Sequence, residues 1–153
     1  MNDTVQETIQ AILQAVRRLL PEFLADPIDR QQSGGNVSVC IVDATGRVHG
    51  EMFGDDAIRK RGTFQTAWRK ASQALITGHP TGTFEELVYA KKLDEHPFGI
   101  SKPDFIGWEG GHPFEIGGVR VAVAVSGMRG VKDTELVRRA VTLATRDAGA
   151  GSP

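Results

Sequence analysis

Two histidines of this chain stand in the same short sequence pattern and are candidates for acid/base catalysis or metal binding. Each precedes a proline and a phenylalanine, in the segments 96–98 and 112–114. An imidazole titrates near neutral pH, so it can act as a general acid or base, and its neutral form can bind a metal ion. The proline restricts the backbone before it, and an aromatic ring follows, so His96 and His112 together could bracket a flat ligand. Ordinary loop histidines would give the same pattern.

His112 is the stronger of the two candidates. It follows two glycines that let the backbone approach closely, and it opens a short expected strand that would anchor it. His96 lies farther from expected regular structure. Because residues 94–99 contain few apolar anchors, His96 is the better candidate for a mobile lid.

A group of cationic side chains offers a second kind of chemistry. Its members are Arg59, Lys60, Arg61, Arg69 and Lys70. A guanidinium pairs with a carboxylate through two parallel hydrogen bonds, so Arg61 or Arg69 could hold the carboxylate of a ligand or substrate. The solvated face of a helix would explain the same group equally well.

Familiar catalytic and cofactor motifs are absent from the sequence. Ser126-Gly127 lacks the Gly-x-Ser-x-Gly context of a nucleophile elbow, and no phosphate-binding loop, dinucleotide-binding glycine motif or zinc-ligand spacing occurs. An enzyme of small-molecule catabolism would therefore depend on His96 or His112 as its general acid or base.

Apolar periodicity predicts the elements that must position these residues. Spacing of about 3.6 residues predicts helices over 4–20, 56–77 and 83–92 and a last one from Asp133 or Thr134. Runs rich in β-branched residues predict strands over 37–43, 47–53, 112–116 and 119–125. The polar stretch 29–36 and the long segment 94–111 are expected to be loops, and Pro21 is expected to interrupt the first helix. A loop as long as 94–111 is usually functional or wrapped around something.

The order helix, hairpin, helix, hairpin, helix predicts an α+β fold. Strands joined by short turns pair antiparallel, so we expect a single sheet of about five strands flanked by helices. The whole chain, 1–153, is expected to form one domain with a frayed tail from about residue 149.

Composition narrows the class of protein. The chain has 18 Lys and Arg against 19 Asp and Glu, a balance that favours neither nucleic acid nor a membrane surface as a partner. Its single cysteine, Cys40, cannot form an internal disulfide, and no stretch approaches the roughly 18 apolar residues of a membrane span. With no signal peptide evident, the cytoplasm is the simplest compartment.

Three segments together resemble one known family. They are the strand and turn 39–47, the helical segment 67–71, and the double-glycine segment 109–118 that leads to 125–127. Their order and spacing, over roughly residues 37 to 142, resemble the GlcG/HbpS-type family, often labelled haem-degrading or haem-binding domains. The long loop before Gly110, together with Trp68, looks most like the branch called UPF0303.

The resemblance implies a profilin-like or PAS-like sheet, assembly into homo-oligomers, and haem or another small molecule as the ligand. Haem iron needs a neutral imidazole, a thiolate or a phenolate, which limits the axial candidates to the four histidines, Cys40 and Tyr89. Cys40 is more simply a small buried hydrophobic residue of a strand. The expected pocket combines the loop 94–116 with the helix around Phe64 and Trp68. The residues expected to bind the ligand are His112, His96, Phe114, Trp68, Arg61 and Arg69, with His112 as the metal ligand.

Three functions remain open from the sequence. The first is a haem-binding or other small-ligand-binding protein with a sensing, storage or accessory role. The second is the enzyme described above, acting on a carboxylate substrate, and the third is an oligomeric adaptor whose surfaces matter more than a pocket. A Soret band of the purified protein would favour the first.

Overall fold

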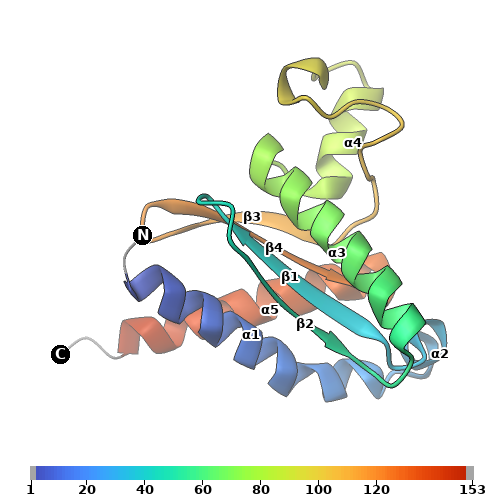
Figure 1. Ribbon diagram of the computed structural model, residues 1–153, viewed down its shortest axis with the longest axis vertical. Coiled ribbons are helices and arrows are strands. Elements are labelled where there is room, and N and C mark those ends of the chain that lie inside the picture. Colours follow the sequence, from blue (N-terminus) through green and yellow to red (C-terminus); the bar gives the residue numbers. More distant parts are fainter. Residues whose placement is uncertain (1–2, 151–153) are drawn as a thin grey trace.

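Figure 1 shows the computed structural model, which describes residues 3–150. Four strands form one antiparallel sheet in the order β2-β1-β4-β3. The strands are β1 (Val37–Asp43), β2 (Val48–Phe53), β3 (Gly111–Ile116) and β4 (Val119–Ser126). The expected α+β class is confirmed. The expected count of about five strands is too high. The two hairpins pair with each other through β1 and β4, and residues 3–150 contain no further strand.

Helices cover both faces of this sheet (Figure 1). They are α1 (Asp3–Leu24), α2 (Pro27–Ser33), α3 (Ala57–Thr77), α4 (Thr81–Tyr89) and α5 (Gly130–Ala150), with a short 3-10 turn at His96–Phe98. Helix α5 includes the start of the tail expected to fray, and residues 151–153 lie outside the described part of the chain. No helix within residues 3–150 is long and apolar enough to cross a membrane.

One face of the sheet carries the larger apolar core. Side chains alternate along a strand, so Val39 and Ile41 of β1 and Val123 of β4 point to the same side. There they join the apolar stripes of α1 and α5 in a single cluster of buried residues. Burial of this stripe explains why α1 continues beyond Pro21 to Leu24. Pro21 occupies an exposed position on the helix, while Phe23, beyond it, is buried in the core.

The opposite face is built from small residues, so α3 packs close to the strands. Ala71 and Ala74 of α3 face Ala122 and Ala124 of β4 in a second cluster. At Gly50 of β2, an added methyl group would lie 2.7 Å from the ring of Phe64 in α3. The close approach of this helix decides how its polar side chains meet the sheet.

The segment 29–36, expected to be a loop, contains most of helix α2. Asp26 caps this helix by accepting a hydrogen bond from the Ile28 N–H, and Gly34 ends it in a left-handed conformation. The helix has no apolar stripe from which it could be predicted, because the residues on its buried face, Asp29 and Ser33, are polar. Asp29 is fully buried and binds the Arg129 guanidinium at 2.8 and 3.1 Å.

The long loop after α4 has a small core of its own. The ring of Phe84 meets the rings of Phe98 and Phe105 edge to face, at centroid distances of 5.8 and 5.4 Å. Helix α4 and this loop project away from the sheet (Figure 1). Gln73 of α3 then holds the returning chain, since its side-chain amide exchanges two hydrogen bonds, of 2.7 and 2.8 Å, with the backbone of Ile106.

Candidate functional site

A buried ion pair lies where α3, β4 and α5 meet. Lys70 is 2% exposed, and its Nζ donates to the carbonyl of Val125 at 3.0 Å and to Oδ2 of Asp133 at 3.3 Å. The other carboxylate oxygen of Asp133 accepts a hydrogen bond from the Met128 N–H at 3.1 Å. Asp133 therefore fixes both the lysine of one helix and the turn that begins another.

The double glycine makes room for this pair. A methyl group added at Gly110 would lie 2.8 Å from Cβ of Asp133, and one added at Gly111 would lie 2.8 Å from Cβ of Lys70. Gly110 also has φ of +114°, a conformation that side chains disfavour. Close packing on Lys70 and Asp133 explains both glycines.

Burial acts on the two members of the pair in opposite directions. It lowers the pKa of Lys70 below its ordinary value, against the opposing charges of Asp133 and Glu109. It raises the pKa of Asp133 to about 7, although the nearby Lys70 charge and the Met128 N–H favour the carboxylate. Desolvation thus favours the neutral form of each residue, against the attraction between their charges.

The ion pair forms part of the wall of a cavity of about 590 Å³. The other wall residues include Trp108, Glu109, Ser126, Met128 and Val131. Thr81, which begins α4, donates a hydrogen bond of 2.6 Å to the carbonyl of Trp108 and so fixes this side of the cavity. The volume is within the usual range for small-molecule sites, about 300–1,000 Å³.

An adjacent cavity of about 340 Å³ contains His112 and shares Glu109 and Val131 with the first. Its remaining wall includes Pro80, Thr134 and Arg138. His112 lies on β3 and is 8% exposed, with Nε2 at 3.4 Å from the hydroxyl of Thr134 in α5. This distance is long for a hydrogen bond, so the contact is weak.

The surroundings of His112 keep its ring neutral. Burial is the main cause, and the charges of Arg138 and Lys70 add to it, lowering the pKa of His112 to about 4. A neutral imidazole has a nitrogen lone pair available to a metal ion at physiological pH. His112 thus combines a buried position, a cavity and the protonation state that metal binding requires.

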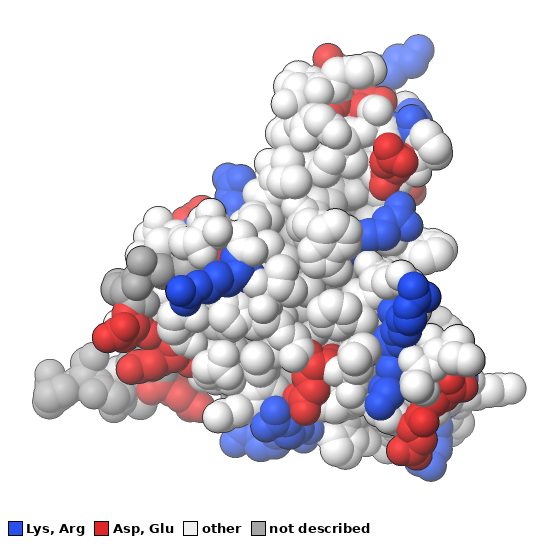
Figure 2. Space-filling view, viewed as in Figure 1, with Lys and Arg blue, Asp and Glu red and all other residues white. Residues whose placement is uncertain are grey.

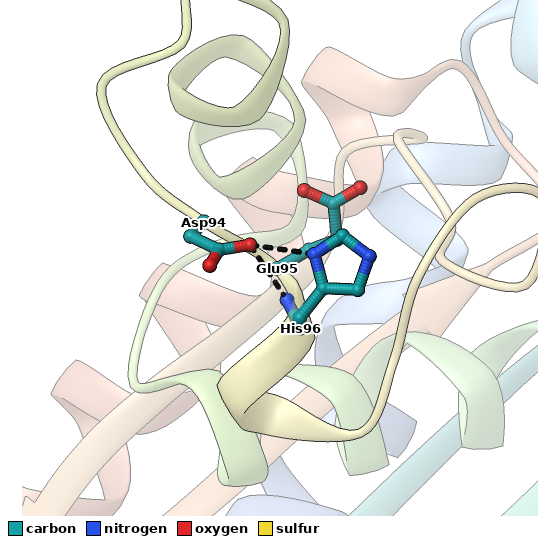
Figure 3. A group of neighbouring side chains, drawn as sticks. All are labelled: Asp94, Glu95 and His96. Atoms are coloured by element: carbon teal, nitrogen blue, oxygen red, sulfur yellow. Dashed lines mark hydrogen bonds and ion pairs between the residues drawn. The ribbon is translucent and has the colours of Figure 1, made fainter.

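His96 lies apart from this site. Figure 3 shows its ring turned toward Asp94, with Nδ1 at 2.7 Å from the carboxylate, and Glu95 beside it. Ligand atoms of these three residues lie within 4.8 Å of one another. The imidazole is 77% exposed, and the hydrogen bond to Asp94 raises its pKa. The structure therefore does not bring His96 and His112 together around one cavity.

The other candidates from the sequence also lie outside the two cavities. Phe114 is on the same face of β3 as His112, at a centroid distance of 6.5 Å, but packs against the larger core. Trp68 is about half exposed on α3, and Arg61 is exposed on the same helix. Arg69 donates a hydrogen bond to the carbonyl of Asp104 and so holds the long loop. None of these four side chains lines either cavity.

The two axial candidates other than histidine, Cys40 and Tyr89, lie away from this site. Cys40 is fully buried, and burial raises its pKa to about 12, so the thiol stays protonated. Tyr89 is exposed and has the Lys102 ammonium 3.9 Å above its ring. Neither residue lines the cavity of His112.

Sequence reasoning missed Lys70, Asp133 and Arg138. Lys70 was named only within a cationic group that could bind a carboxylate or, on the other interpretation, form a solvated helix face. The helical period carried a signal against that interpretation, because Lys70 lies three residues after Ala67 and four before Ala74, on the stripe that faces the sheet. Asp133 was expected only to start the last helix, which in fact begins at Gly130.

Comparisons with known proteins place the chain in a family. The sequence profile described as haem-degrading protein HbpS-like matches residues 5–142. No match was found among curated proteins. Solved structures share the fold, among them a double mutant of Streptomyces reticuli HbpS, with 20% identity, a TM-score of 0.64 and coverage of 94% of this chain and 87% of that chain.

Two further solved structures have the same fold. Klebsiella pneumoniae protein ORFY is 18% identical, with a TM-score of 0.61 over 90% of this chain and 88% of that chain. A complex of PduOC with haem is 20% identical, with a TM-score of 0.58 over 86% of this chain and 91% of that chain. At these identities the structures establish the fold, and the profile establishes the family. The chain belongs to the HbpS-like family of haem-degrading proteins.

Proposed function

We propose that this protein binds haem in the cavity of His112, with His112 as the ligand of the iron. The observation that carries the proposal is the buried, neutral imidazole on the wall of a cavity that also contains Arg138. Membership of a haem-degrading family supports haem as the ligand. The structure of PduOC with haem, which has the same fold, supports it as well.

Several residues of the wall offer contacts to such a ligand, of which the cavity of about 340 Å³ would hold a part. His112 Nε2 could exchange its contact with the Thr134 hydroxyl for iron at little cost, because the hydrogen bond of 3.4 Å is weak. Arg138, exposed on α5, offers a guanidinium to a propionate carboxylate. Pro80 and Val131 provide apolar surface for the ring. When bound, haem would supply an iron centre for a sensing, storage or oxidative role.

The enzyme hypothesis loses the two arginines that it assigned to substrate binding. It relied on Arg61 or Arg69 to hold a carboxylate, and neither side chain lines the cavity of His112. Arg138 would have to take that role. The low pKa of His112, caused mainly by burial, suits metal binding better than proton transfer near pH 7.

Replacing His112 with Ala tests the haem site. We expect the affinity for haem to fall at least about tenfold, roughly 1.4 kcal/mol, because the iron loses its protein ligand. Titration of purified protein with haem, followed by the Soret band, measures this. The matched control is His96→Ala, which removes an exposed imidazole outside the cavity and should leave the affinity unchanged. Unchanged binding in the His112 variant together with a large loss in His49→Ala or Cys40→Ala would place the site at β1 and β2 instead.

We further propose that the protein forms a homo-oligomer through the surface of α3 and β2. Val48 and Met52 of β2 and Trp68 of α3 are each about half exposed. Figure 2 shows that uncharged side chains cover the middle of this side of the molecule, while charged residues lie mainly around it. Apolar surface of this kind is typical of protein interfaces.

Light scattering at micromolar concentration should therefore show a particle larger than the 16.5 kDa chain. A lysine in place of Trp68 should shift the population toward the monomer, because a charge at the centre of an interface is costly to desolvate. Ile28→Lys is the matched control, since Ile28 is comparably exposed, at 57%, but lies on α2. A monomeric wild-type protein would end this proposal without affecting the haem site.

A further inference from the structure

Lys70 lines the larger cavity but not the cavity of the proposed haem site. The side chain is 2% exposed at the molecular surface and lies on the cavity wall beside Asp133. Buried lysines are rare, because transfer of an ammonium out of water is costly. A lysine in this position has either a purely structural role or a role in binding or reacting with a molecule in the cavity.

The hydrogen bonds of Lys70 leave one position of its nitrogen open. An ammonium has three N–H donors. Within residues 3–150, the Nζ of Lys70 has two acceptors, the Val125 carbonyl and the Asp133 carboxylate. The third N–H has no acceptor among these residues, and Lys70 lies on the wall of the 590 Å³ cavity.

We propose that Lys70 is a carbonyl-reactive amine, which binds a small uncharged aldehyde or ketone in the 590 Å³ cavity as an imine. Three observations support this proposal: the cavity, the open position on Nζ, and a carboxylate 3.3 Å away that can accept the ammonium proton. The lowered pKa of Lys70, caused by burial, makes that proton easier to remove.

The reaction needs no group beyond these residues and water. Asp133 takes one proton from the ammonium, and the free lone pair of Nζ adds to the carbonyl carbon to give a carbinolamine. Asp133 then returns its proton to the carbinolamine hydroxyl, which leaves as water while the C=N bond forms. No oxidant or reductant takes part. The raised pKa of Asp133, about 7 because of burial, suits a group that must both accept and return a proton near neutral pH.

The cavity wall indicates the class of carbonyl compound. Trp108, Met128 and Val131 provide apolar surface, and the Trp108 side chain is well exposed to the entering molecule. Glu109 adds a negative charge close enough to act on the pKa of Lys70. This charge disfavours an anionic ligand such as an oxo acid, so an uncharged aldehyde or ketone fits better.

Reductive trapping tests the proposal on the full chain. The protein is treated briefly with propionaldehyde and sodium cyanoborohydride at pH 7, and the modified lysines are identified by peptide mass spectrometry. We expect Lys70 to be modified at least about fivefold faster than the exposed Lys91 and Lys92, because burial lowers the pKa of Lys70 and so makes its amine easier to deprotonate. The preference should disappear in urea-unfolded protein. It should also be weaker with glyoxylate in place of propionaldehyde.

Two variants complete the experiment. Lys70→Arg keeps the charge but cannot form an imine, so it should lose this one modification while the other lysines react as before. His112→Ala should keep the modification at Lys70, which separates this site from the haem site. Modification of Lys70 no faster than that of Lys91 in the folded wild-type protein would overturn the proposal. That comparison within one chain holds even if a variant folds poorly.

Discussion

The variant Asp133→Asn is expected to lower the free energy of unfolding by about 3–5 kcal/mol at pH 7. The asparagine can still accept the Met128 hydrogen bond through Oδ1, but its Nδ2 would face the ammonium of Lys70 with further donors. Lys70 then stays buried with only the charge of Glu109 to oppose its own. Urea unfolding followed by circular dichroism measures the loss.

A double variant distinguishes loss of the ion pair from loss of packing. Lys70→Met with Asp133→Asn removes both charges and keeps most of the volume, so it should recover at least half of the lost stability. Lys70→Met alone should cost less than Asp133→Asn alone, because Asp133, whose pKa burial already raises to about 7, can become neutral by binding a proton. Lys92→Met, on the surface, should change the stability by no more than about 0.5 kcal/mol. A double variant as unstable as Asp133→Asn would show that the buried charge does not account for the effect.

This large effect follows from where the ion pair lies. Lys70 comes from α3 on one face of the sheet, while Asp133 comes from α5, which packs on the other. The pair meets at the end of β4, where the Val125 carbonyl completes the contact. Losing it should loosen the attachment of both helices and disturb the wall shared by the two cavities.

Much of the fold could be predicted because local patterns match local structure. The runs of β-branched residues at 37–43 and 119–125 are the two central strands, and the apolar stripes of the first and last helices form the larger core. Helix α2 could not be predicted in this way. Its buried residues, Asp29 and Ser33, are polar, and Asp29 is satisfied by Arg129, a partner 100 residues away.

The candidate site was predicted less well, for a similar reason. The position of His112 was deduced correctly as the start of a strand after two glycines, because those signals are local. Its separation from His96 depends on the path of the loop after α4, which tertiary contacts such as that between Gln73 and Ile106 decide. For Lys70, a carboxylate-binding role and a solvated helix face both stayed open, although its helical phase indicated burial.

Acid should destabilise this protein through His112. The pKa of His112 is about 4 in the folded chain, mainly because of burial, against an ordinary value of 6.5. Between these values the unfolded chain binds a proton that the folded chain does not. The contribution of His112 is therefore complete above about pH 6.5 and is lost as the pH falls toward 4. Asp133, whose pKa burial raises, acts in the opposite direction over part of this range, so the wild-type profile alone does not isolate the histidine.

The difference in free energy of unfolding between the wild-type protein and His112→Gln isolates the contribution of His112. Glutamine does not titrate, so the stability advantage of the wild type over this variant should shrink by about 2–3 kcal/mol between pH 7.5 and pH 4.5. Urea unfolding without haem at both values gives the four free energies needed. Removing the charge of Arg138 with Arg138→Gln should make the loss smaller, because this guanidinium is the second cause of the low pKa of His112. An advantage that does not change with pH would mean that the imidazole is solvated in the folded protein, and the neutral ring on which the haem site depends would then have no basis in burial.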